Sequence, residues 1–264
     1  MSRAARRSLR SLPAPGDAPG PPHLRSLRLR LADGAWTTLH VASYHPARTA
    51  LRVVRLPKPT PLEAWCAENG AAEAIVGGFF VRATGVPLGE VRTGGMVRAT
   101  VPFAAPWGGR RACVHAAGEA VTIARRPELP ADPRGDLLEA GPLLVSGGAP
   151  CVAGDPEGFS AGCGQFDSDI TAGRYPRAAL GIGRRGRLLA VAADGRGEHD
   201  AGLTLAELAE ALVALGATRA LNLDGGGSTS LVCAGALQNR PREGDGAPIP
   251  AGRPVTTALA FTSR

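Results

Sequence analysis

One acidic residue stands beside the most flexible part of the chain. In the segment ALNLDGGGSTSLV (220–232), an apolar run that contains Asn222 ends at Asp224, and three glycines and three hydroxyl residues follow at once. Glycines allow successive backbone N–H groups to approach a ligand with no side chain in the way, and such amides bind anions. We therefore expect a ligand site here, for which a phosphate group is the natural partner. A tight turn in which Asp224 caps the backbone is the structural alternative.

The donors of this segment come from the backbone and from hydroxyl groups. Its glycines are Gly225, Gly226 and Gly227, and its hydroxyl residues are Ser228, Thr229 and Ser230. No lysine follows the glycines, as a P-loop requires, and the dinucleotide pattern G-x-G-x-x-G is absent. These two absences disfavour nucleotide binding.

Other charged residues stand at the ends of expected strands or in polar loops. They are Arg177 before AALGIG, Asp194 and Arg196 in ADGR, Asp167 and Asp169 in the loop 158–170, and Arg253 in AGRPVTTALAF. Each one alone is explained by turn chemistry or by a solvated rim charge, although an arginine at a strand entrance also suits a bidentate clamp for an oxyanion. Together they suggest one shared polar site.

The segment TLAELAEALVALGA (204–217) precedes Asp224 and is expected to help position it at that site. Thr204 and Glu207 form a capping-box pattern, leucines recur at helical spacing, and Gly216 ends the helix. A strand over RALNL completes a strand, helix and strand unit, so we expect Asp224 at the carboxyl end of a central strand, where α/β folds place ligands.

Most of the remaining pattern predicts strands. Period-2 alternation from His23 to Val54 predicts a meander with a turn at Asp33 and Gly34. Further strands are expected over 72–80, 110–124, 143–152, 178–183 and 187–194, with a short helix over 61–70. The expected fold class is α+β (mixed α/β): a strand-rich single domain over 23–264 with a mixed sheet, a few helices and one long helix at about 204–216.

The first 22 residues combine arginine with proline, glycine and alanine, which predicts a disordered basic leader. Residues 1–30 hold seven arginines against one aspartate, and so account for +6 of the formal net charge of +7. The folded part is near neutral, which argues against a nucleic-acid-binding surface.

No apolar run in this leader is long enough for a secretory signal, and we expect no membrane span. The five cysteines contain no C-x-x-C pair, so buried reduced thiols are preferred to a zinc site. With these features the sequence predicts a cytoplasmic protein.

The chain resembles the phosphodiester glycosidase family. The residues that carry the resemblance are RAALGIG, GRLLAVAADGR, the helix with LNLDGGGSTS, GALQNRP and GRPVTTALAF, supported by GGFF and LLEAGPLLVSGG upstream. The resemblance covers roughly residues 70–264. It implies hydrolysis at the anomeric carbon of a sugar that is linked through a phosphodiester.

That reaction needs carboxylates and a cluster of donors for the phosphate. The resemblance places Asp224 and Asp194 in the carboxylate roles, without deciding which is acid and which is base or nucleophile, and Arg177 among the catalytic residues. The expected substrate-binding residues are Arg196, Asn222, Gly225, Gly226, Gly227, Ser228 and Thr229. No metal ligand is assigned, with a divalent cation near the aspartates as a secondary alternative.

The expected partner is a small-molecule or oligosaccharide phosphodiester. Two other functions stay open at this point: a module that binds a phosphosugar or polysaccharide without turnover, and a structural role. Neither the oligomeric state nor the identity of the sugar follows from the sequence.

Overall fold

The computed structural model describes residues 22–105, 107–152, 157, 165 and 173–264. The leader expected over 1–22 lies outside them apart from Pro22, as do Cys163, Asp167 and Asp169. The described chain is rich in strands, and the α+β class is confirmed.

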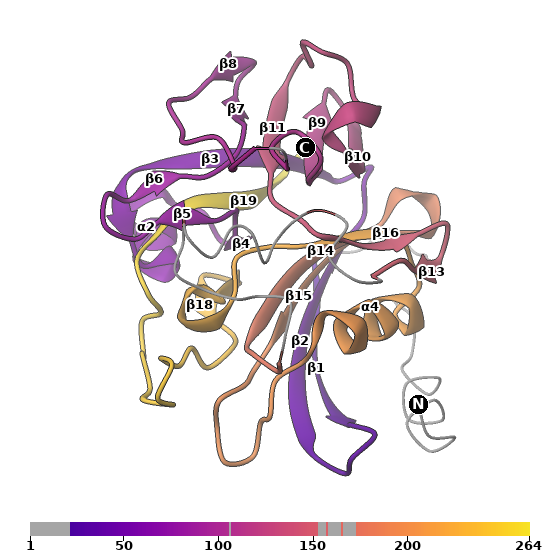
Figure 1. The fold of residues 1–264 in the computed structure, drawn as a ribbon, viewed down its shortest axis with the longest axis vertical. Coiled ribbons are helices and arrows are strands. Elements are labelled where there is room, and N and C mark those ends of the chain that lie inside the picture. Colours follow the sequence, from indigo (N-terminus) through magenta and orange to yellow (C-terminus); the bar gives the residue numbers. More distant parts are fainter. Residues whose placement is uncertain (1–21, 106, 153–156, 158–164, 166–172) are drawn as a thin grey trace.

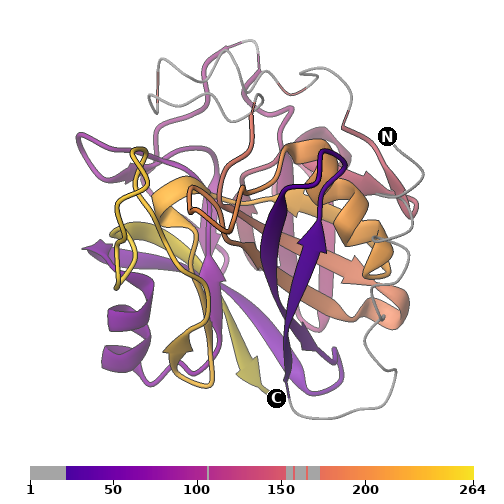
Figure 2. The ribbon, with the colours of Figure 1, turned by 90° about the horizontal axis from the view of Figure 1, so that it is seen from below.

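The largest sheet has seven strands in the order β1-β2-β15-β14-β16-β12-β13. Their bounds are β1 His23–Arg30, β2 Trp36–Tyr44, β15 Leu188–Ala193, β14 Arg177–Gly183, β16 Ala217–Asn222, β12 Leu143–Ser146 and β13 Ala149–Pro150. Figure 2 shows the hairpin of β1 and β2 in indigo at one edge of this sheet.

A five-stranded sheet has the order β18-β17-β4-β19-β3. Its strands are β18 Ala236–Leu237, β17 Leu231–Cys233, β4 Ala74–Val76, β19 Val255–Ser263 and β3 Thr49–Thr60. A further sheet orders β10 Ala120–Arg125, β9 Ala112–Ala117, β11 Asp136–Glu139, β7 Val91–Thr93 and β8 Met96–Val97, and a small pair joins β5 Phe80–Val81 to β6 Val86–Pro87. Apolar side chains from all three larger sheets form one core between them.

Two α-helices accompany the sheets among the described residues: α2 Leu62–Asn69 and α4 Leu205–Ala214. The capping box of α4 is present, since the Thr204 side chain accepts from the Glu207 N–H and the Glu207 carboxylate accepts from the Thr204 N–H. The leucine face of α4 packs on the seven-stranded sheet over β12, β13 and β16 and forms a second core (Figure 1). The prediction of this helix is confirmed, because the capping residues and the spacing of the leucines act over a short stretch of sequence.

The order of the strands explains how distant segments meet. β14 lies between β15 and β16 and is antiparallel to both, so β15 and β16 run in the same direction. Asp194 follows the end of β15, Asp224 follows the end of β16, and Arg177 begins β14. All three positions therefore lie at one edge of the sheet, as the strand-end pattern suggested.

Two expectations about the strands were wrong. Every pair of neighbouring strands in the described sheets is antiparallel, where a mixed sheet was expected, because β14 separates β15 from β16. The meander from His23 to Val54 also breaks after β2: β3 leaves it and pairs with β19 in the other sheet. Alternation of apolar residues marks a strand but carries no information about its partner.

Burial agrees with the prediction for three cysteines. Cys66, Cys113 and Cys233 are buried and unpaired, and burial raises the pKa of each thiol. Cys151 is half-buried and also unpaired. In the part of the chain that the structure describes, no helix has the length and apolar character needed to cross a membrane.

Candidate active site

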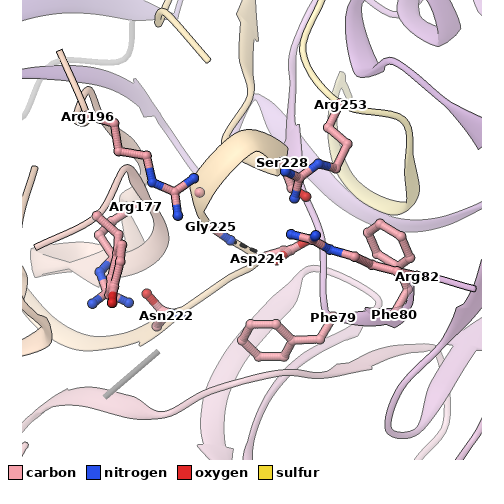
Figure 3. A pocket seen from close by; sticks show the side chains of 12 residues that line it. Phe79, Phe80, Arg82, Arg177, Arg196, Asn222, Asp224, Gly225, Ser228 and Arg253 are labelled. Carbon is pink, nitrogen blue, oxygen red and sulfur yellow. Dashed lines mark hydrogen bonds between the residues drawn. The ribbon is translucent and has the colours of Figure 1, made fainter. Parts of the chain in front are cut away.

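A pocket opens at the edge of the sheet where β14, β15 and β16 meet. The hollow, together with the solvent space at its opening, has a volume of about 610 Å³. The lining residues are Phe79, Phe80, Arg82, Tyr175, Arg177, Arg196, Asn222, Asp224, Gly225, Gly226, Ser228 and Arg253 (Figure 3). Four of them are arginines and one is a carboxylate, so the lining is strongly positive.

Asp224 lies at the centre of this pocket. Its N–H donates to the Gly77 carbonyl at 2.9 Å, which fixes the backbone against the segment that precedes Phe79. Its Oδ1 accepts from the Gly225 N–H at 2.8 Å, and the Ser228 hydroxyl also hydrogen-bonds the carboxylate. Burial outweighs these bonds and the nearby guanidinium groups, and it raises the pKa of Asp224 to about 6. A carboxylate in this condition titrates close to neutral pH, as acids and bases in active sites do.

Three arginine side chains reach the pocket from different sides of Asp224 (Figure 3). Arg196 follows β15 with a left-handed backbone (φ 57°), Arg253 precedes β19, and the exposed Arg82 follows β5. Burial lowers the pKa of Arg196, and the positive charges of Arg253 and Arg82 lower it further. Glu243 pairs with Arg253 and offsets one of these charges. Cations held this close together favour the binding of an anion among them.

Arg177 forms the deep wall of the pocket. Its guanidinium is buried, donates to the Leu203 carbonyl at 2.9 Å and to the Gly173 carbonyl at 3.3 Å, and lies 5.2 Å from the centre of the Tyr175 ring. The guanidinium of Arg196 lies over the same ring at 5.4 Å. Tyr175 thereby holds two of the pocket's cations in place.

Asn222 contributes a buried acceptor. Its Nδ2 donates to the Leu223 carbonyl at 2.6 Å, which directs the amide, while its Oδ1 has no hydrogen-bond partner among the described residues. The side chain is only 1% exposed, yet it lines the pocket. Because buried polar atoms are nearly always hydrogen-bonded, this oxygen is suited to accept from a ligand.

Two of the three glycine amides are already hydrogen-bonded within the protein. The Gly225 N–H donates to Asp224 and the Gly226 N–H donates to the Pro176 carbonyl at 2.9 Å, so neither amide is free for a phosphate. A methyl group on Gly226 would lie 3.2 Å from Nη1 of Arg196, and one on Gly227 would lie 2.8 Å from Nη2 of Arg253. Gly226 and Gly227 therefore make room for the guanidinium groups of Arg196 and Arg253.

Asp194 is the predicted site residue that the structure keeps out of the pocket lining. Its carboxylate is buried and accepts from His40 at 3.0 Å and from the Arg240 N–H at 2.7 Å. The expected carboxylate pair is therefore not formed in the pocket. Gly227 and Thr229 do not line the pocket either; the Thr229 side chain is completely buried behind it.

Sequence reasoning brought together Asp224, Asn222, Arg177, Arg196, Gly225, Gly226 and Ser228, all of which line the pocket. It missed Phe79, Phe80, Arg82 and Tyr175 as site residues. Arg253 was noted as a charge at a strand entrance without being assigned to binding, and the GGFF motif was the available signal for the two phenylalanines. Within the described ranges, no three His, Cys, Asp or Glu side chains are grouped to hold a metal ion.

Known proteins are similar to part of this sequence. A family model described as phosphodiester glycosidase matches residues 69–262. The bovine N-acetylglucosamine-1-phosphodiester alpha-N-acetylglucosaminidase is 31% identical over 183 residues, which are 66% of this chain and 33% of the bovine protein. The human protein of the same name is 42% identical over 67 residues, 25% of this chain and 13% of its own length. The chain thus spans about a third of the length of the bovine relative at most.

Solved structures share the fold. The catalytic domain of the zebrafish N-acetylglucosamine-1-phosphodiester alpha-N-acetylglucosaminidase superposes with a TM-score of 0.71 and 20% identity, covering 95% of this chain and 87% of that one. A hypothetical protein from Synechocystis gives a TM-score of 0.63 and 21% identity, covering 94% and 64%. The family match runs from the end of α2 into β19 and confirms the family predicted from the sequence: the chain belongs to the phosphodiester glycosidase family.

Proposed function

We propose that this chain hydrolyses the glycosidic bond between the anomeric carbon of a sugar and the phosphate of a phosphodiester. The observation that carries the proposal is the arrangement of Arg82, Arg196 and Arg253 around Asp224, whose pKa burial raises to about 6. The names of the bovine and zebrafish relatives support the same substrate class. The sugar and the alcohol on the far side of the phosphate are not specified by this arrangement.

The arginines bind the phosphate and stabilise it as it leaves. When the bond between the anomeric carbon and the ester oxygen breaks, the phosphate gains a negative charge. Arg196 and Arg253 are placed to neutralise that charge, because their guanidinium groups lie against Gly226 and Gly227 beside Asp224. The pocket is thus more complementary to the departing phosphate than to the diester.

One carboxylate is sufficient for this reaction. A leaving alcohol needs a general acid, whereas a phosphate monoester has a second pKa near 6 and leaves without a proton. Asp224 therefore acts in its ionised form at the anomeric carbon, either by taking a proton from the attacking water or by attacking directly, in which case the phosphate leaves and water then cleaves the glycosyl ester on Asp224. The first product anomer, observed by NMR, separates these two routes, since activation of water inverts the configuration and direct attack retains it.

The sugar contacts the uncharged lining residues Phe79, Phe80 and Asn222. Aromatic rings cover apolar faces of a ligand, and the unpartnered Oδ1 of Asn222 accepts from one of its donors. Such a site orients the anomeric carbon toward Asp224.

A turnover screen tests the proposal. Purified protein is incubated with aryl phosphodiesters and with sugar-1-phosphodiesters, and the released sugar and phosphate monoester are measured. Release of both from sugar-1-phosphodiesters, abolished in Asp224→Asn, is the expected result. Binding without release would make the chain a phosphosugar-binding module, and absence of both binding and release would contradict the proposal.

A further inference from the structure

The carboxylate that pairs with Arg253 has no role in the function proposed so far. Glu243 forms an ion pair with the guanidinium of Arg253, and its own side chain is 43% exposed. Glu243 does not line the pocket of Asp224. A negative charge therefore lies outside the pocket but directly against a group to which we assign phosphate binding.

The turn 242–248 holds Glu243 in this place. Arg242 and Pro248 form an antiparallel bridge across the turn. Within it, the Glu243 N–H donates to the Ala247 carbonyl at 2.9 Å, and the Gly246 N–H donates to the Glu243 carbonyl at 3.1 Å. The backbone of Glu243 is thus fixed by hydrogen bonds inside the turn.

The other charged side chains of this turn are bonded within it. Arg242 Nη1 donates to the Gly246 carbonyl at 2.7 Å, and Asp245 Oδ1 accepts from the Ala247 N–H at 2.9 Å. The side chain of Glu243 instead extends out of the turn to Arg253. Its charge is therefore the one that the turn directs toward the pocket.

The same turn contacts Arg196. Arg196 Nη1 donates to the Arg242 carbonyl at 3.3 Å, and a methyl group on Gly246 would lie 2.9 Å from the carbonyl oxygen of Arg196. Burial lowers the pKa of Arg196 and the positive charge of Arg253 lowers it further, whereas the negative charge of Glu243 opposes both. One carboxylate thus acts on two cations of the pocket.

Arg253 is confined by contacts that do not involve Glu243. Its N–H donates to the Gly227 carbonyl at 3.1 Å, and a methyl group on Gly227 would lie 2.8 Å from Nη2 of its guanidinium. Because these contacts already hold Arg253 against Gly227, we expect Glu243 to affect the pocket mainly through its charge.

We infer that Glu243 is a specificity-determining residue that weakens the binding of a phosphate monoester more than the binding of a phosphodiester. The inference rests on the proposed function, in which the diester is the substrate and the monoester is a product. A phosphodiester carries one negative charge, whereas a monoester carries two above its second pKa of about 6. Repulsion by a fixed charge is proportional to the charge of the ligand, so Glu243 disfavours the product more than the substrate. The arginines that stabilise the departing phosphate would otherwise retain it.

The test measures the binding of two small ligands by calorimetric titration at about pH 8. Dimethyl phosphate is a singly charged diester, and methyl phosphate is a doubly charged monoester. Glu243→Gln removes the charge and keeps a side-chain acceptor for Arg253, and this variant is expected to bind methyl phosphate about tenfold more tightly and dimethyl phosphate about threefold more tightly than the unmodified protein. The logarithms of these two gains differ by a factor of about two, as the charges of the ligands do. Both gains should shrink as the salt concentration is raised.

Two further variants separate the charge from other effects. Glu243→Ala removes both the charge and the contact with Arg253, and it should give the same gains as Glu243→Gln. Glu68→Gln makes the same change of net charge at an exposed position on α2 outside the pocket, and it should alter neither affinity.

Weaker binding of both ligands by Glu243→Ala, with no change in Glu243→Gln, would show that Glu243 only positions Arg253. Equal changes for the two ligands, no change in either variant, or the same gains in Glu68→Gln would also contradict the inference. Neither ligand contains a glycosidic bond, so the result does not depend on turnover. Absence of hydrolysis of sugar-1-phosphodiesters, with the two ligands bound as expected, would contradict the proposed function alone.

Discussion

Nε2 of His40 lies 3.0 Å from Oδ2 of Asp194, and both side chains are buried. The other ring nitrogen of His40 lies 3.0 Å from the Ser26 hydroxyl, and Oδ1 of Asp194 accepts from the Arg240 N–H. Asp194 therefore links β2 to the segment after β18 directly, and it is linked to β1 through His40. Each of its two carboxylate oxygens is thus hydrogen-bonded within the protein, to His40 and to the Arg240 N–H.

Asp194→Asn is expected to lower the free energy of unfolding by about 1–3 kcal/mol, because it disturbs a buried hydrogen-bonded pair. Turnover of a small phosphodiester should change by less than about tenfold. Denaturant unfolding and steady-state kinetics on the same preparation check both values. A loss of about 10²-fold in turnover at unchanged stability would indicate that Asp194 takes part in catalysis.

Asp224→Asn is expected to reduce kcat by about 10²–10⁴-fold, the usual contribution of a general base, or by more if Asp224 is the nucleophile. The fold should persist, since asparagine keeps an acceptor for the Gly225 N–H. Circular dichroism and kcat together measure this. Near-normal kcat in the folded variant would remove Asp224 from the mechanism.

The pH dependence follows from the same residue. Because Asp224 acts in its ionised form and its pKa is raised to about 6, kcat/KM should fall as the pH drops below about 6.

The free energy of unfolding should change with pH in the opposite direction. A raised pKa in the folded state means that ionisation of Asp224 costs stability, and this cost appears as the pH rises from about 4 through 6. Asp224→Asn should therefore be more stable than the unmodified protein at pH 7, and the difference should narrow toward pH 4. A kcat/KM profile that instead rises toward acid pH would show that the protonated form is the active one.

Two glycines with the same backbone angle separate strain from function. Gly226 and Gly118 both have φ 60°, so alanine strains the backbone similarly at each. Only at Gly226 would the methyl group approach a guanidinium, at 3.2 Å from Nη1 of Arg196; at Gly118 nothing lies within 4 Å. Gly226→Ala should lower kcat/KM by about 10²-fold, the effect of a displacement of about 1 Å, and Gly118→Ala should lower only the melting temperature. Equal kinetics in the two variants would leave the triple glycine as a simple turn.

Arg253 tests the phosphate role most directly. Arg253→Lys keeps the charge but loses the planar fork, so kcat/KM for a phosphodiester should fall by about tenfold or more. The same variant should bind the free sugar as the unmodified protein does, because the loss is confined to phosphate contacts. Calorimetric titration with the sugar and with inorganic phosphate measures the two affinities separately. A loss of sugar affinity would contradict the assignment of Arg253 to phosphate binding.

Elements and site residues were predictable from the sequence where the interactions that determine them are local along the chain. The helix of residues 205–214 and its capping box were predicted correctly because Thr204, Glu207 and Gly216 act within one or two turns. The partner of β3 was not predictable, since it pairs with β19 about 200 residues later. For the site, strand ends located Asp224, Arg177 and Arg196, but the direction of a side chain depends on tertiary packing. The side chain of Asp194 points toward His40 because of such packing. No local sequence pattern marked Tyr175 or Arg82 as residues of the pocket.

The central place of β19 in its sheet has a consequence for biosynthesis. β19 lies between β4 and β3, so these two early strands have no neighbour on their facing edges until residues 255–263 have been translated. Unpaired strand edges are sites of association with other chains, so β3 and β4 are open to such association until β19 has been synthesised. Arg253 lies two residues before the same strand, so the group of arginines around Asp224 is completed only when this strand docks. If the proposed function holds, the chain therefore gains its full set of phosphate contacts only after β19 has joined the sheet.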